Sequence, residues 1–176
     1  MVNYAKNLEK REIQKMTFPL IKKQKMVSLA GPNLSNYLDV IPSVIKDVEV
    51  YENSKKIMIV QMSDIKKVKR KITYHCKDII HAEVDKRTFY DLDFCSSIKG
   101  AEDYIRKFGA CAFSLTLSLR PVSLEKTLNR FFTLCDEKVL IDIPHPNYNL
   151  VRTTRSKYIY ITYFDIWPMV TIFKFH

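Results

Sequence analysis

Asp91 and Asp93 stand two positions apart, a spacing that places two carboxylates on the same side of a strand. Such a pair could hold a divalent cation and support catalysis. The same spacing is usual in solvated loops, so a lone pair of this kind does not define a catalytic centre. An enzyme built around these two carboxylates is a third hypothesis, after the two binding hypotheses given below. We do not expect the chain to be an enzyme.

Histidine and cysteine residues lie close together in sequence at His75, Cys76 and His81. Zinc sites usually take pairs of ligands two to four residues apart, and this group has no matching second pair. The four cysteines of the chain stand in apolar stretches without CxxC spacing. We therefore predict no metal site, and we interpret the cysteines as small buried hydrophobic side chains.

A dense run of positive charge lies between two apolar stretches, residues 57–62 and 72–76. The run contains five cationic side chains: Lys66, Lys67, Lys69, Arg70 and Lys71. Neighbouring like charges repel one another, so a fold gains little stability from holding them together, whereas an anionic partner would use them well. We predict that the two apolar stretches form a hairpin that presents these five side chains to such a partner.

Two further groups of cations extend the predicted anion-binding surface. The first group lies in the N-terminal segment and contains Lys22, Lys23 and Lys25. The second group contains Arg152, Arg155 and Lys157, and it runs into a stretch with several tyrosines. Aromatic rings beside cations suit stacking on nucleobases, and they equally suit a membrane interface. The alternative is that tyrosine and β-branched residues simply form a strand there.

An excess of positive charge characterises the whole chain, in which 29 Lys and Arg residues against 19 Asp and Glu residues give +10 over 176 residues. This balance favours nucleic acid or nucleoprotein as a partner, or peripheral binding to an anionic membrane surface. A solubilising surface is the alternative. The chain has only three glycines and neither GxGxxG nor GxxxxGK[ST]. Both common kinds of nucleotide-binding enzyme need such loops, so we predict no cofactor.

The pattern of apolar and polar residues predicts a chain made mainly of strands. We expect strands over residues 48–51, 56–62, 67–76, 110–119, 139–143, 157–164 and 169–175. Short helices are expected after Asn33 and over residues 101–108 and 124–134. Strands follow one another at both ends and helices interrupt the middle. This order is typical of an α+β fold with a mixed, mainly antiparallel sheet and three or four short helices.

Charge is segregated along the chain. Residues 1–25 carry seven cations and two acids, and we predict that they form a basic N-terminal arm or docking helix ahead of a single α+β domain over residues 26–176. Residues 78–103 carry three cations and seven acids. A basic face could meet this acidic segment in a second copy, so we expect a homo-oligomer; neutralisation within one monomer is the alternative.

The expected location is the cytoplasm, with peripheral binding to a membrane or incorporation in a virion. The N-terminal segment is rich in Lys and Arg and lacks the apolar core of a secretion signal. The sequence contains no run of 18 apolar residues of the kind that spans a bilayer. We therefore expect any contact with a membrane to be at its surface.

In size and charge the chain resembles the matrix proteins of plant-infecting rhabdoviruses. The resemblance rests on the basic N-terminal arm, the scarcity of glycine, and the order strand, Pro121, helix and strand over residues 113–143. It implies a protein that condenses the nucleocapsid and lines the membrane. The PPxY motif of many animal members is absent, which leaves the recruitment of budding partners in doubt.

These features lead to two hypotheses about binding. The leading one is a non-enzymatic basic structural protein of viral matrix type, which self-associates and bridges the nucleocapsid and the inner membrane leaflet. The alternative is a single-stranded nucleic-acid-binding protein, such as a viral movement or silencing-suppressor protein. It would use Arg152, Arg155 and Lys157 with the nearby tyrosines. Both hypotheses require the cations to form one coherent patch.

Overall fold

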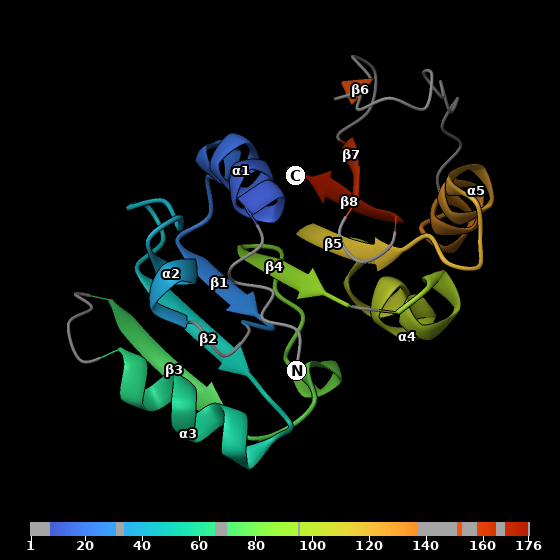
Figure 1. The fold of residues 1–176 in the computed structure, drawn as a ribbon. Helices are drawn as coiled ribbons and strands as arrows, with labels where there is room; N and C mark the ends of the chain where they lie inside the picture. Colours follow the sequence, from blue (N-terminus) through green and yellow to red (C-terminus); the bar gives the residue numbers. More distant parts are fainter. Residues whose placement is uncertain are drawn as a thin grey trace. The chain divides into compact units, whose positions relative to one another are not determined.

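The structure of the chain is a computed structural model, shown in Figure 1. It describes residues 8–30, 34–65, 70–94, 96–136, 151–152, 158–164 and 168–175. The chain divides into two compact units, Met1–Asp91 and Leu92–His176. Each unit has its own buried core.

The first unit is built around parallel strands. In chain order its elements are α1 (Leu8–Thr17), η2 (Phe18–Leu20), β1 (Lys25–Ser28), α2 (Leu34–Leu38), β2 (Asp47–Tyr51), α3 (Lys55–Asp64), β3 (Lys71–His75), η3 (Ile79–His81) and β4 (Thr88–Asp93). The last two residues of β4 belong to the second unit. The strand order is β3-β2-β1-β4, and all three strand pairs are parallel. Parallel neighbours need crossover connections rather than tight hairpins.

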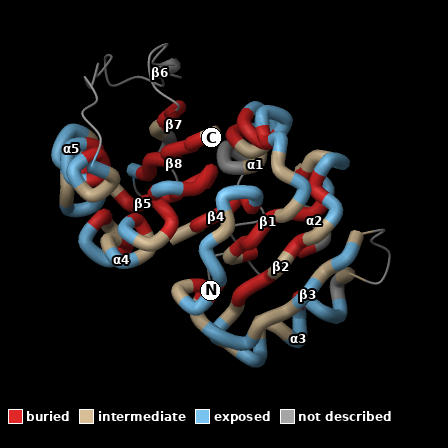
Figure 2. Tube along the Cα trace, turned by 180° about the vertical axis from the view of Figure 1, so that it is seen from behind, coloured by how far each residue is buried: buried red, intermediate tan, exposed pale blue. Residues whose placement is uncertain are grey.

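The two faces of these strands differ in polarity. Met26, Val48 and Phe89 are register partners on one face, and all three are buried. Phe18 packs against this face, with its ring centroid 6.4 Å from that of Phe89. The opposite face is more mixed: it carries the charged Glu49, and also Val27 and Tyr90, which are buried. Figure 2 shows β2 largely buried and β3 intermediate to exposed, in line with the position of β3 at the end of the strand order.

The predicted hairpin over residues 56–76 is wrong. Its first apolar stretch forms helix α3, which begins after Ser54, whose hydroxyl accepts a hydrogen bond from the Ile57 amide at 3.5 Å. The helix is the crossover between the parallel strands β2 and β3. The composition of a short apolar run is compatible with a strand and with a helix. The N-cap at Ser54 favours the helix here. Only the second half of the predicted strand 67–76 is confirmed, as β3.

The second unit is antiparallel. Its elements are α4 (Ile98–Phe108), β5 (Ala112–Ser118), α5 (Leu124–Leu134), β6 (Val151–Arg152), β7 (Tyr158–Phe164) and β8 (Pro168–Lys174). The strand order is β5-β8-β7-β6. The core is aromatic: the Phe131 ring lies 5.9 Å from Phe113 and 5.7 Å from Tyr158, centroid to centroid. The Ser123 hydroxyl caps α5 by accepting from the Lys126 amide at 3.4 Å.

Most of the elements predicted for the second unit are confirmed. The helices over 101–108 and 124–134 lie in α4 and α5, and the strand over 110–119 is β5. The predicted strand 157–164 is β7, which ends at the predicted residue, and the predicted strand 169–175 is β8, which lies one residue earlier in the chain. The predicted strand 139–143 lies outside the described residues.

A mixed sheet combined with helices is confirmed as the fold class. The antiparallel pairs lie in the second unit, whereas the first unit alternates strands and helices and is therefore α/β in character. The predicted division into an arm over 1–25 and one domain over 26–176 stays a prediction. Across the part of the chain that the structure describes, no helix has the length and apolar character needed to cross a bilayer.

Candidate functional site at the carboxyl edge of the parallel strands

The order of the parallel strands singles out one place in the first unit. From β1 the chain moves to β2 and then to β3, and β4 then returns to the other side of β1. In open parallel sheets, ligands bind at the carboxyl ends of the strands where the order reverses in this way. That point lies between β1 and β4, where Ser28 and Asp91 are register partners.

A buried chain of hydrogen bonds occupies this point. The Ser28 hydroxyl donates to the Tyr37 oxygen at 2.7 Å, and the Tyr37 hydroxyl donates to Asp91 Oδ2 at 2.6 Å. All three side chains are buried. Burial, followed by the charge of Asp91, raises the pKa of Tyr37 well above its usual value of 10.0. The phenol therefore remains a proton donor, and it holds the Asp91 carboxylate in place.

Backbone contacts draw the loop after β1 into the same place. The Leu29 amide donates to the Asp91 carbonyl at 3.1 Å. The buried Gln61 side chain, on α3, donates from its amide nitrogen to the Ala30 carbonyl. Helix α3 thus supports the start of the loop that joins β1 to α2. The middle of this loop, residues 31–33, lies outside the described residues.

A second carboxylate stands directly after β2. The Glu52 amide donates to the His75 carbonyl at 3.0 Å, which ties the end of β2 to the end of β3. Its side-chain Oε1 accepts from the Ser54 amide at 2.7 Å, and the residue is half-buried. After β3, Asp78 caps η3 by accepting from the Ile80 amide at 2.8 Å. The ends of β2, β3 and β4 therefore each bring a carboxylate to this edge of the first unit.

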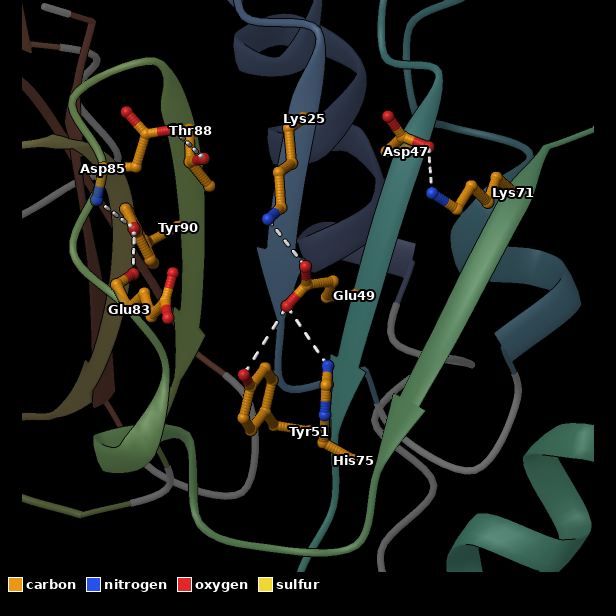
Figure 3. A network of polar contacts seen from close by, with 10 residues as sticks. All are labelled: Lys25, Asp47, Glu49, Tyr51, Lys71, His75, Glu83, Asp85, Thr88 and Tyr90. Carbon is orange, nitrogen blue, oxygen red and sulfur yellow. Dashed lines mark hydrogen bonds and ion pairs between the residues drawn. The ribbon is translucent and has the colours of Figure 1, made fainter.

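The polar face of the first unit carries a separate network, shown in Figure 3. Glu49 lies at its centre, with Lys25 Nζ 2.6 Å from one carboxylate oxygen and His75 Nε2 3.2 Å from the other. The Tyr51 ring stacks on the His75 ring at 4.4 Å between centroids. Burial alone would raise the pKa of Glu49, but Lys25 and His75 together lower it below its usual value of 4.5.

The predicted anion-binding cations differ in their environments in the structure. The structure pairs Lys25 with Glu49, and it places Lys71 Nζ 3.8 Å from Asp47, with the lysine side chain largely exposed. Lys22 is exposed and Lys23 half-buried. Arg152 lies in β6, and only its backbone is described. The other predicted cations lie outside the described residues: Lys66, Lys67, Lys69, Arg155 and Lys157. Anion binding by these residues stays a prediction.

Arg70 faces the backbone of its own unit. Its guanidinium donates to the carbonyl oxygens of Ile41, Pro42 and Ile45 at 2.6, 2.9 and 3.2 Å. These carbonyls follow helix α2, where the chain turns toward β2. Arg70 therefore satisfies main-chain acceptors in a turn, a role that its place in the basic run did not indicate.

We expect Arg70→Gln to lower the free energy of unfolding by about 2 kcal/mol, because three carbonyls lose a charged donor. Lys71→Gln is the matched control, since its exposed ion pair is worth at most about 1 kcal/mol. Chemical denaturation followed by circular dichroism measures both. Equal stability of the two variants would contradict the structural role of Arg70.

The carboxylate pair at Asp91 and Asp93 is not arranged as the metal site considered from the sequence. Asp91 accepts from Tyr37 and is buried. Among the described residues, no group of three or more His, Cys, Asp and Glu side chains could hold a metal ion. His75 of the considered zinc group contacts Glu49 across the strands.

No protein-family profile and no curated protein sequence matches the chain. Solved structures match its fold. TYW2 of M. jannaschii, in complex with AdoMet, matches with a TM-score of 0.63 at 13% identity, over 100% of this chain and 78% of that one. TYW2 of P. horikoshii, in complex with MeSAdo, matches with 0.61 at 12%, over 99% and 64%. The M. jannaschii tRNA m1G37 methyltransferase matches with 0.61 at 12%, over 100% and 51%.

These likenesses show the fold. The chain has an α/β fold consistent with the Rossmann-like fold of these methyltransferases. It spans about half the length of the tRNA m1G37 methyltransferase and a larger share of the two TYW2 chains.

The fold overturns the resemblance to rhabdovirus matrix proteins, which is wrong. The order strand, Pro121 and helix is present as β5 and α5, but so short an order of elements occurs in unrelated folds. The predicted non-enzymatic structural role, and the alternative of a viral nucleic-acid-binding protein, are contradicted with it. The expectation that the chain is not an enzyme is also contradicted, because the structures that share its fold are methyltransferases.

Proposed function

We propose that the chain is a methyltransferase domain that binds S-adenosylmethionine at the carboxyl edge of β1, β2 and β4 and acts on nucleic acid. The observation that carries the proposal is the buried Ser28–Tyr37–Asp91 chain at the point where the strand order reverses. Polar side chains of this kind are expected where a ligand binds in an open α/β sheet. The methyltransferase fold of the neighbours supports the choice of ligand.

The side chains at this edge fit a nucleoside that carries positive charge. Glu52 follows the first strand–helix turn by about 20 residues, the spacing at which an acidic side chain binds ribose hydroxyls in Rossmann folds. Asp78 and Asp91 add two more carboxylates after β3 and in β4. S-adenosylmethionine has a sulfonium cation and no phosphate. The absence of a glycine-rich phosphate loop, from which we predicted no cofactor, is therefore no obstacle.

Each residue has a defined task in this proposal. When bound, S-adenosylmethionine supplies a methyl group on a positively charged sulfur, which leaves as a neutral thioether when the methyl group is transferred. Glu52 would accept hydrogen bonds from the ribose, and the Ser54 amide orients its carboxylate. Tyr37 holds Asp91 in a fixed rotamer beside the loop after β1. Such fixed dipoles contribute to catalysis because they need no reorganisation during the reaction.

Nucleic acid is the substrate class that the charge of the chain favours. The net charge of +10 suits association with a polyanion. Two of the proteins that share the fold are named as tRNA methyltransferases, one for m1G37 and one for m1A58. The predicted contribution of Lys22, Lys23, Arg152 and the other cations to anion binding becomes, in this proposal, a contribution to holding the substrate.

Isothermal titration calorimetry with S-adenosylmethionine tests the proposal. We expect the wild-type chain to bind, and Glu52→Gln to bind about tenfold more weakly, because a charged acceptor for the ribose is lost. Glu125→Gln, an exposed change in the first turn of α5, is the matched control and should bind as wild type. Transfer of a tritiated methyl group to RNA then tests the substrate. Absence of any binding by the wild-type chain would overturn the proposal.

A further inference from the structure

Helix α3 carries apolar side chains on its outer side as well as on its inner side, where Ile57 and Met58 are half-buried. Its glutamine, Gln61, is fully buried, whereas three of its aliphatic side chains face outward. Ile59, Val60 and Met62 are 56%, 51% and 49% exposed. Steps of three and four residues bring Ile59, Met62 and Lys55 to one side of the helix. Contiguous apolar side chains on the surface of a soluble unit mark a binding surface more often than a random scatter does.

The charges at the start of α3 are opposite in sign to those that the helix dipole favours. Lys55 and Lys56 occupy the first turn of α3, both are exposed, and the first turn contains no acidic residue. The positive end of the helix dipole lies there, so the two lysines do not favour the helix, and the Glu52 carboxylate that accepts from the Ser54 amide offsets part of this charge. Among the outward side chains that the structure describes on α3, positive charge is the only charge.

We infer that the outer face of α3, formed by Lys55, Lys56, Ile59, Val60 and Met62, docks on an anionic lipid surface. Aliphatic side chains that enter the headgroup region, flanked by lysines that meet the lipid phosphates, are the chemistry of interfacial helices. Nucleic acid would engage the lysines and leave the three aliphatic side chains in water. An acidic protein would need to supply an apolar groove and carboxylates in matching places, whereas an anionic membrane offers an apolar layer and lipid phosphates over any area.

Flotation with lipid vesicles tests this inference on the full chain. We expect binding to vesicles rich in phosphatidylserine, little binding to vesicles of phosphatidylcholine alone, and weaker binding at high salt. Ile59→Ser with Val60→Ser and Met62→Ser should weaken binding by at least about tenfold, since three aliphatic side chains that would enter the lipid are lost. The matched control is Met16→Ser with Val84→Ser, two exposed aliphatic residues outside α3, which should bind as wild type.

Reversal of the two lysines separates docking from folding. Lys55→Glu with Lys56→Glu places acids in the first turn, which favours the helix dipole, so the fold should be kept or stabilised. Vesicle binding should nevertheless fall at least about tenfold, at about 1 kcal/mol for each lysine near the surface. Lys126→Glu, in the first turn of α5, is the control.

Three outcomes would overturn the inference: no binding of the wild-type chain to anionic vesicles, equal binding to both kinds of vesicle, or a lysine reversal that weakens binding to single-stranded RNA but not to vesicles. The result is independent of S-adenosylmethionine binding, because Lys55, Lys56 and the three aliphatic side chains lie outside the proposed ligand site. Failure of one proposal therefore leaves the other standing.

Discussion

Phe131→Ala is expected to lower the free energy of unfolding by about 3 to 5 kcal/mol, the largest effect of any single change considered for this chain. Phe131 is fully buried, and its ring makes edge contacts with Phe113, Phe132 and Tyr158 at centroid distances of 5.9, 5.1 and 5.7 Å. Alanine removes the ring and leaves a cavity among partners that come from β5, α5 and β7. Strands β5 and β7 are both paired with β8, so the partners of Phe131 cannot close the gap fully.

The control is chosen from the same helix. Asn129→Ala is an exposed change on α5, and it should alter the free energy of unfolding by less than about 0.5 kcal/mol. Urea denaturation followed by circular dichroism compares the two variants, and Phe131→Leu should lie between them. A loss below about 1 kcal/mol for Phe131→Ala would contradict the packing of the aromatic core.

Tyr37→Phe is expected to lower the free energy of unfolding by about 2 kcal/mol, because the buried Asp91 carboxylate loses its donor at 2.6 Å. Asp91→Asn should show a loss of similar size. The double variant should lose less than the sum, since the two side chains belong to one hydrogen-bonded chain. Additive losses would mean that Tyr37 and Asp91 do not act together, and the proposed site would lose its central element.

The pH dependence gives an independent readout of the same contact. A raised pKa means that the fold favours the neutral phenol, so Tyr37 contributes its full stability below its ordinary pKa of 10.0. This contribution is lost as the pH rises above that value toward the pKa of the folded state. Stability above pH 10.0 should therefore fall more steeply in the wild-type chain than in Tyr37→Phe. Parallel curves would contradict the burial of this phenol beside a carboxylate.

The second unit was largely predictable from the sequence because its signals are local. The alternation along β5 and the cap at Ser123 both depend on residues only a few positions apart. The first unit was less predictable. The apolar run in α3 does not follow a helical period, since Gln61 faces inward and Ile59 outward. The absence of a helical period removes the signal by which a helix is recognised.

The candidate site was missed because Ser28 and Asp91 meet only through the parallel register, and Tyr37 reaches them from helix α2. Asp91 is 63 residues from Ser28 and 54 from Tyr37 in the sequence, and nothing local to any of the three indicates the other two. Asp91 was singled out for its spacing to Asp93, which suggested a metal rather than a buried hydrogen bond. Glu52 could have been found from its place after a strand, but only once β1 and β2 were known to be parallel.

The charged face of the first unit bears on how short such a unit can be. Parallel strands ordinarily need helices over both faces because both are apolar. The link from β3 to β4 here contains only η3, a single short turn, and the strands beside it carry Glu49 with Lys25 and His75. Side chains that satisfy one another can stay hydrated, so the part of this face around Glu49 needs no covering helix, although Val27 and Tyr90 on the same face are buried. Ionic pairing thus substitutes for part of a helical layer, and a set of parallel strands can be assembled from a shorter chain.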